Sequence, residues 1–161
     1  FHLPGEILGL DGLGTGVHTC DSIALTVANV CEIHLNDLER VASLLPSLQH
    51  QLLKIIGQSM NRDQKHVEIL AKKNAQERVA IFLHQLAERY KLLGRSEHRF
   101  MIPMSRDDIG SYLGLVIETV SRTFSKMQED GLIAINGRDV QILKQDQLYK
   151  LAHESHVRKI A

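Results

Sequence analysis

A helix–turn–helix pattern at residues 104–130, MSRDDIGSYLGLVIETVSRTFSKMQED, constrains this chain more than any other feature. Ser105 is followed three residues later by Asp108, the capping-box pattern that starts a helix. Gly114 provides a tight turn, and a second helix is predicted over residues 116–128. Its buried face consists of three apolar residues: Val120, Phe124 and Met127. Two short helices with a glycine turn and these anchors are typical of a DNA-binding helix-turn-helix.

The segments on either side extend this motif to a winged helix. Residues 131–144, GLIAINGRDVQILK, predict two strands around Asn136-Gly137, a strong hairpin signal. Upstream, AQERVAIFLHQLAERYKLLG predicts an amphipathic helix that stops at Gly94. The run RFMIP predicts a short strand closed by Pro103.

The outward face of the second helix predicts contacts with DNA. Arg122 can donate two hydrogen bonds to guanine O6 and N7, and Glu118 can accept from cytosine N4. Arg106 and Lys126 are better placed for phosphates. The predicted DNA-binding set is Glu118, Ser121, Arg122, Arg106, Ser125 and Lys126. The alternative is a solvated helix face on a helical hairpin that binds no DNA.

A long helix is predicted over residues 46–73, with Pro46 in its first turn. Its apolar residues repeat at spacings of three and four, which is a heptad seam with one carboxylate in the middle. The seam residues are Leu53, Ile56, Met60, Asp63, Val67 and Leu70.

This seam has two interpretations: packing on its own domain, or pairing with a second copy across a two-fold axis. In the dimer, two Asp63 carboxylates would approach each other. Two unit charges ~4 Å apart repel by about 4 kcal/mol at an effective dielectric constant of about 20. The sequence therefore predicts a marginal, switchable dimer.

Residues 1–35 are predicted to be β-structure. A Gly-rich stretch is followed by SIALTVANVCEIHL, which is rich in strand-forming residues and predicts two strands. Asn36 is then the predicted N-cap of a short helix. Because the chain opens at Phe1 inside strand-like sequence, we expect the closing half of a β-roll from an N-terminally truncated protein.

Composition excludes several classes of protein. The chain is 43% apolar and 24% charged with no net charge, an ordinary globular mix. It has no run of about 18 apolar residues, so no membrane span is predicted. Cys20 and Cys31 do not form a disulfide framework, and with no export signal a cytoplasmic location is expected.

No enzyme is predicted, because the sequence lacks paired histidines of the H-E-x-x-H kind and a nucleophile elbow. The competing hypothesis is a metal or thiol protein built on His18, Cys20, Cys31 and His34. Cys31 and His34 are an odd number of residues apart, so they would point to opposite faces of a strand. Four convergent ligands are therefore not expected.

Through MSRDDIGSYLGLVIETVSR and KKNAQERVAIFLHQLAERY, the chain resembles the cAMP receptor protein/FNR superfamily of bacterial transcription regulators, and its oxygen-responsive FNR subgroup in particular. The resemblance implies an α+β fold with three parts. These are a partial β-roll sensor domain (cyclic-nucleotide-binding-like) at residues 1–45, a dimerisation helix at 46–73 and a C-terminal winged helix-turn-helix at 74–161.

The resemblance also implies roles for particular residues. Glu118, Ser121 and Arg122 match the E-x-x-S-R set that reads palindromes of TTGAT-type half-sites in double-stranded DNA. Cys31 matches one ligand of an oxygen-labile 4Fe-4S cluster, and Asp63 matches the acidic residue that keeps the oxidised protein monomeric. The loop at residues 91–99 lies where the family contacts RNA polymerase.

The sequence departs from the family at three points. The other three cysteine ligands of the cluster are absent from this chain, and no cyclic-nucleotide cassette is visible between Gly9 and Ala24. Val116 stands where the family usually has Thr or Ser. The implied function is a homodimeric regulator of oxygen-responsive genes, and the alternative is a cluster-free relative that responds to another ligand.

Overall fold

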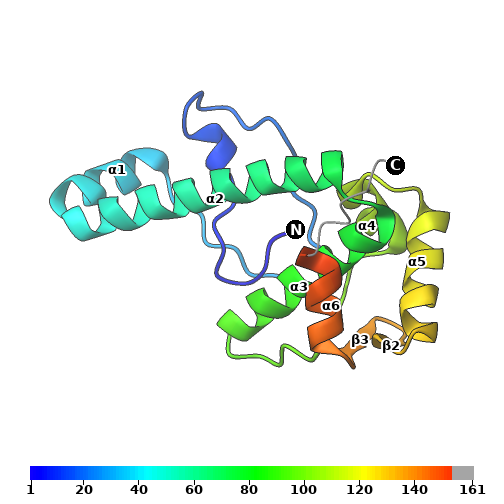
Figure 1. Cartoon of the computed structure of the whole chain (residues 1–161). Helices are drawn as coiled ribbons and strands as arrows, with labels where there is room; N and C mark the ends of the chain where they lie inside the picture. The colour runs from blue at the N-terminus through cyan, green and yellow to red at the C-terminus, as the bar shows by residue number, and fades with distance from the viewer. Residues whose placement is uncertain (154–161) are drawn as a thin grey trace. The chain divides into compact units, whose positions relative to one another are not determined.

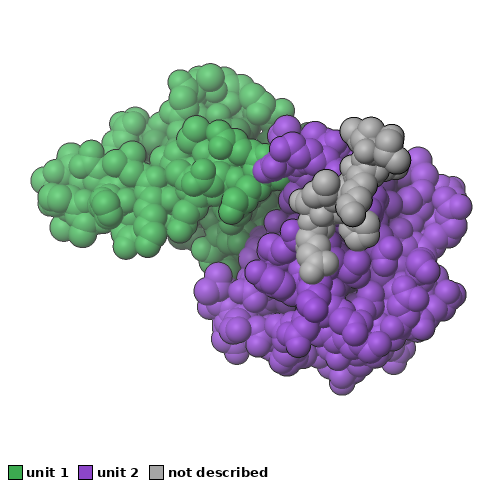
Figure 2. Space-filling view, in the orientation of Figure 1, with its two compact units in different colours: residues 1–66 green, residues 67–161 purple. Residues whose placement is uncertain are grey.

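The computed structural model describes residues 1–153, so the last eight residues of the predicted 74–161 domain lie outside the described part. The chain divides into two compact units, one of residues 1–66 and one that begins at Val67 (Figure 2). The boundary falls inside the long helix α2, Pro46–Lys72, so the last turns of this helix belong to the second unit.

The first unit contains a short 3-10 helix, Leu10–Gly12, the helix α1, Leu35–Leu44, and most of α2. The strands predicted at residues 22–35 are not present: residues 1–34 contain no strand (Figure 1). The physical reason is that a strand needs a hydrogen-bonded neighbour, and apolar residues of this segment such as Ile23 and Val27 are exposed. Strand-forming composition alone does not make a sheet.

Helix α1 begins two residues earlier than predicted. Its N-cap is His34, which makes no side-chain capping bond, and Asn36 lies within the first turn. Asp37 in the same turn places a carboxylate near the positive end of the helix dipole. Helix α2 begins at Pro46 as predicted, because proline at the first helical position forgoes an N–H that would be unpartnered anyway.

The second unit is a winged helix-turn-helix, as predicted. Its helices and strands, in chain order after the end of α2, are α3 (Ala75–Leu92), β1 (Arg99–Met101), α4 (Arg106–Leu113), α5 (Ile117–Glu129), β2 (Ile133–Asn136), β3 (Asp139–Ile142) and α6 (Gln145–His153). The sheet is antiparallel in the order β1-β3-β2, so β3 is the central strand. Val140 of β3 pairs with Phe100 of β1 and with Ile135 of β2.

Helix α3 provides much of the core of this unit. Its buried residues include Val79, Leu83 and Leu86, and its N-terminus is fixed by a capping box between Asn74 and Glu77. Helix α6 was not predicted. The signal for it is the pair Leu148 and Ala152, four residues apart and both buried, on the face that packs against α3.

Candidate nucleic-acid interface

The first helix of the motif, α4, is fixed at both ends by local interactions. Ser105 Oγ accepts from the Asp108 N–H at 3.0 Å, and the Ser105 N–H donates to Asp108 Oδ2 at 2.8 Å. Ser105 Oγ also donates to Asp108 Oδ2 at 2.7 Å. This hydroxyl bond, and then the bond from the Ser105 N–H, hold the pKa of the Asp108 carboxyl below its usual value. At the other end, Gly114 adopts φ +61°, a left-handed conformation that favours glycine. The predicted capping box and glycine turn are both confirmed.

The turn between the two helices approaches α4 closely at Gly110. A β-carbon at Gly110 would lie 2.5 Å from the backbone oxygen of Leu115. The N–H of Leu115 donates back to the Gly110 oxygen at 2.9 Å. The missing side chain therefore lets the turn lie directly on α4, and this contact helps to set where α5 begins.

Helix α5 separates an apolar face from a polar one. Val120, Phe124 and Met127 are buried, as predicted. The opposite face is exposed and carries the predicted base- and phosphate-contacting residues Glu118, Ser121, Arg122, Ser125 and Lys126. The structure thus brings five of the six predicted DNA-binding residues together on one solvent-facing surface.

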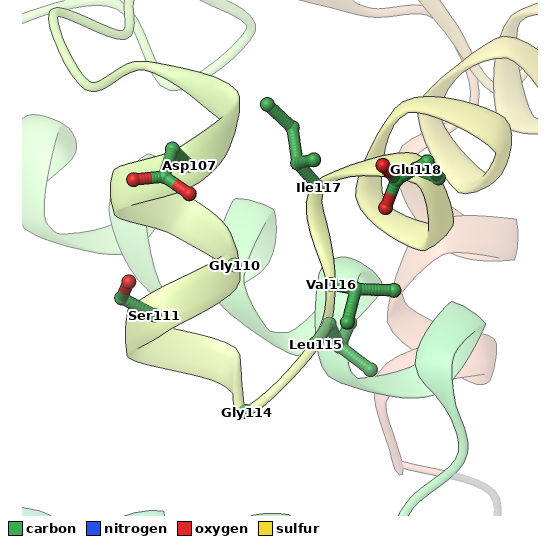
Figure 3. Close-up of a pocket in the computed structure, with 8 residues that line it drawn as sticks. All are labelled: Asp107, Gly110, Ser111, Gly114, Leu115, Val116, Ile117 and Glu118. Atoms are coloured by element: carbon green, nitrogen blue, oxygen red, sulfur yellow. The ribbon is translucent and has the colours of Figure 1, made fainter.

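The start of this surface borders an open depression of about 560 Å³ between α4 and α5. Figure 3 shows Asp107 and Ser111 on α4, with Ile117 and Glu118 at the start of α5. Val116 occupies the N-cap position, where its aliphatic side chain accepts no hydrogen bond from the first turn.

Arg122 is partly oriented before any ligand binds. Its Nη2 donates to Thr119 Oγ1 at 3.3 Å, one turn earlier on the same helix. Thr123 is likewise tied back, with its Oγ1 donating to the Thr119 oxygen at 2.7 Å. These bonds lie along the helix and leave the Arg122 side chain exposed.

Arg106, the sixth predicted residue, lies apart from the other five. It is half-buried at the start of α4, and its guanidinium carbon is 3.8 Å from the centre of the Phe124 ring. Burial lowers the pKa of this guanidinium, which nevertheless stays charged at neutral pH.

Sequence reasoning missed Arg138. This exposed residue follows Gly137 in the two-residue turn of the wing, and it lines a small hollow of about 220 Å³ together with Arg106. The sequence did contain a signal for it: Arg138 directly follows Gly137 in the predicted hairpin, and a cation in that turn lies at the tip of the wing. Two guanidinium groups therefore lie on the wing side of the motif.

The predicted seam of α2 is largely exposed in the single chain. Leu53, Met60 and Val67 are 63%, 59% and 66% exposed, and Asp63 between them is also exposed. Ile56 and Leu70 are half-buried. No residue of this 27-residue helix is buried.

The predicted metal ligand, Cys31, is exposed, and so is Cys20. Cys20 lies 3.9 Å from the Asp11 carboxylate, which also accepts the Thr19 N–H at 2.8 Å. Across residues 1–153 no three His, Cys, Asp or Glu side chains are arranged to hold a metal ion. A 4Fe-4S cluster takes four ligands, so the residues described do not by themselves fit one.

The metal or thiol protein considered as an alternative required His18, Cys20, Cys31 and His34 to converge, and within the described part of the chain they form no such group. In the same residues, no helix combines the length and apolar character needed to cross a membrane.

Helix α5 with its exposed polar face, the glycine turn before it and the three-stranded sheet that includes the β2–β3 wing define a winged helix-turn-helix protein of the Crp type. Residues 77–151 match the family model of the Crp-like helix-turn-helix domain. The second unit therefore carries a Crp-like helix-turn-helix domain, and the chain as a whole is similar to regulators of the CRP/FNR superfamily.

Named relatives agree with this assignment. The chain is 43% identical over 152 residues to the transcriptional activator protein FnrA of Stutzerimonas stutzeri, covering 94% of this chain and 62% of FnrA. It is 37% identical over 161 residues to the fumarate and nitrate reduction regulatory protein of Escherichia coli K12, covering 100% of this chain and 64% of that protein. The chain therefore spans less than two thirds of the length of these relatives.

Among solved structures, FixK2 from Bradyrhizobium japonicum superimposes with a TM-score of 0.68 at 31% identity. The match covers 74% of this chain and 59% of FixK2. A CRP/FNR regulator of Thermus thermophilus, 22% identical with a TM-score of 0.56, supports the fold alone.

Proposed function

We propose that the protein is a sequence-specific DNA-binding transcription regulator of the FNR type and not an enzyme. The observation that carries the proposal is the exposed face of α5, where Glu118, Ser121 and Arg122 project from a helix whose other face is buried. A helix of this kind is positioned to enter the major groove with side chains at base edges.

Arg122 is the residue proposed to read guanine in a TTGAT-type half-site, through paired bonds to O6 and N7. Glu118 accepts from a cytosine N4, and Ser121 contacts a base edge or phosphate. Lys126 and Ser125 contact phosphates along the same helix, and Arg106 and Arg138 do so from the wing side.

The protein is proposed to act as a homodimer joined through α2. The exposed seam residues Leu53, Met60 and Val67 lie along one side of the helix and would be buried by a second copy. A two-fold dimer presents two α5 helices, which fits a palindromic operator.

The proposed contact with RNA polymerase is the loop between α3 and β1. Lys91 Nζ, in the last turn of α3, lies 2.8 Å from Oε2 of Glu97 in the loop, and this ion pair raises the pKa of Lys91 and lowers that of Glu97. The pair ties the far end of the loop back to the end of α3 and so gives the loop a defined shape for recognition.

Cys31 is proposed as one ligand of a 4Fe-4S cluster, with the remaining ligands supplied from outside the described residues. The alternative is an FNR-like regulator that responds to another ligand. Iron analysis and the visible spectrum of protein purified without oxygen separate the two. A spectrum that bleaches in air and is lost in Cys31→Ser supports the cluster, and an iron-free protein that still binds operator DNA supports the alternative.

A comparison of two substitutions on α5 tests DNA reading. Arg122→Ala should cost about 1–3 kcal/mol of specific binding and relax the preference at one guanine. Lys126→Ala should weaken binding to all sequences alike and reduce the dependence of log K on log salt by about one unit. Competition binding with single-base operator variants measures both. Unchanged discrimination in Arg122→Ala, or a wild-type affinity that is insensitive to salt, contradicts the proposal.

A further inference from the structure

Arg78, in the first turn of α3, binds backbone carbonyls from two separate segments of the second unit. Its Nε donates to the Lys73 oxygen at 2.8 Å, and its Nη2 donates to the Leu70 oxygen at 2.7 Å. Its Nη1 donates to the oxygens of Leu113 and Gly114 at 2.9 and 3.3 Å. One side chain therefore joins the end of α2 to the turn of the helix-turn-helix.

The four acceptors lie where helices end. Helix α2 ends at Lys72 and α4 ends at Leu113, so several of these carbonyls lack a partner within their own helix. The C-terminus of a helix also carries the negative end of its dipole, which attracts a cation. The guanidinium caps two helices at once with a single charge.

The geometry requires arginine rather than any cation. A guanidinium is planar and holds five N–H donors in a rigid fork, so it can reach acceptors on opposite sides at the same time. A lysine ammonium carries the same charge as a single point, and it can approach one of the two segments but not bridge both with this arrangement.

We propose that Arg78 is a positioning residue that fixes the orientation of the helix-turn-helix relative to the end of α2, residues 67–72. This inference rests on the proposed function. Gly114 leads through Leu115 and Val116 directly to the first residue of α5. In a dimer joined through α2, the link at Arg78 therefore sets how far apart, and at what angle, the two reading helices meet half-sites about 10 base pairs apart.

The first test needs no DNA. Spin labels are attached at two exposed positions of the second unit, Ala71 on α2 and Ser111 on α4, with Cys20 and Cys31 changed to serine. The chain with Arg78 should give one narrow distance distribution, and Arg78→Ala and Arg78→Lys should broaden or shift it.

The matched control is Arg95→Ala, which removes a guanidinium from an exposed loop of the same unit and should leave the distribution unchanged. If Arg78→Ala does not fold, Arg78→Lys gives the answer, because it keeps the charge and most of the side-chain stem. The proposal is overturned if the spin-label distances in Arg78→Lys have the same mean and the same width as those in the parent chain.

The second test measures operator spacing. Affinity of the dimer is compared for palindromes whose half-sites are moved apart by one or two base pairs, and for a single half-site. With Arg78 we expect a steep preference for one spacing. Arg78→Lys should lower the affinity for the preferred palindrome at least about tenfold, flatten the spacing preference, and leave single half-site binding within about twofold.

The results separate the two proposals. If the parent protein binds no palindrome, the proposed function is wrong, and the spin-label distances still decide the role of Arg78. If Arg78→Lys weakens single half-sites and all palindromes equally while the spacing preference is kept, Arg78 stabilises the domain without positioning it, and the inference is overturned.

Discussion

The guanidinium of Arg106 lies over the ring of Phe124, with its central carbon 3.8 Å from the ring centre. This cation–π contact joins the first turn of α4 to the buried face of α5, so it fixes the two helices of the motif against each other. Arg106→Ala should therefore lower the free energy of unfolding by about 1–2 kcal/mol, since a partly desolvated pair is stronger than an exposed one. Urea unfolding measures the change.

Arg106→Lys is the control for charge. It keeps a cation that can reach phosphate but loses the planar group that stacks on the ring. We expect it to lose stability and retain most of the salt dependence of DNA binding. A variant without Arg106 that unfolds at the same urea concentration as the parent would show that the contact contributes nothing.

Val116 leaves the N-terminus of α5 without a side-chain cap. Val116→Thr has nearly the same shape and adds a hydroxyl that can accept from the N–H of Glu118 or Thr119. Because Val116 is 64% exposed, little burial is lost, and the cap should stabilise the domain by about 1 kcal/mol. Thermal unfolding of Val116→Thr and Val116→Ala gives the comparison. Equal midpoints for the two would mean that no cap forms.

Gly114 is held at φ +61°, where a β-carbon is unfavourable. Gly114→Ala should destabilise the second unit by about 1 kcal/mol through the backbone alone, because the nearest atoms to a new β-carbon are at ordinary contact distances. Ser111→Ala, on the exposed face of the preceding helix, should change stability by less than about 0.5 kcal/mol. Chemical denaturation of both variants tests the difference, and a Gly114→Ala protein as stable as the parent would refute the strained turn.

His84 makes the stability of the second unit depend on pH. It is half-buried, with edge contacts to the rings of Tyr149 and His153 at 5.4 and 5.1 Å. Burial, and then the nearby His153, lower the pKa of His84 from its usual 6.5. The unfolded chain therefore binds this proton more readily, and the associated stability is complete above about pH 6.5 and is lost as the pH falls through the lowered pKa.

His84→Asn should reduce the loss of stability between pH 7 and pH 5.5, and substitution of the exposed His50 should not. Urea midpoints at the two pH values give the comparison. An identical loss in His84→Asn and in the parent would assign the effect to other groups.

Asp63 should control the oligomeric state. Asp63→Ala removes a repulsion of about 4 kcal/mol for charges ~4 Å apart at intermediate dielectric, so the dimer dissociation constant should fall at least about tenfold. Gln64→Ala, one position off the seam, is the control. Sedimentation velocity over a concentration series measures both, and a monomer population unaffected by Asp63→Ala would place Asp63 away from the interface.

Much of the winged helix could be predicted because its signals are local. The capping box of Ser105 and Asp108, the turn at Gly114 and the wing hairpin each depend on a few neighbouring residues. The hairpin turn itself is Gly137-Arg138, one position later than the predicted Asn136-Gly137, because Asn136 still pairs with Asp139. The exposed face of α5 followed from the spacing of its buried residues. The strands predicted at residues 22–35 were wrong because strand formation depends on a partner elsewhere, which composition does not provide.

The bonds of Arg78 could not be predicted for a different reason. All four of its acceptors are backbone oxygens. Because every residue has a backbone oxygen, the sequence does not indicate which of them Arg78 binds. The stacking of Arg106 on Phe124 was missed because the two residues lie on different helices, whose crossing depends on the glycine contact at Gly110.

The position of β3 between β1 and β2 has a consequence for how the second unit assembles. The hairpin β2–β3 closes over two residues, but Arg99 in β1 pairs with Gln141, and its guanidinium binds Asp139 at 2.6 Å. That pairing closes a loop of about forty residues that contains both α4 and α5, and its closure costs more entropy than closure of the two-residue hairpin. We therefore expect the local hairpin β2–β3 to form before β1 joins it, so the segment that carries the reading helix is enclosed only once this long-range pairing has formed.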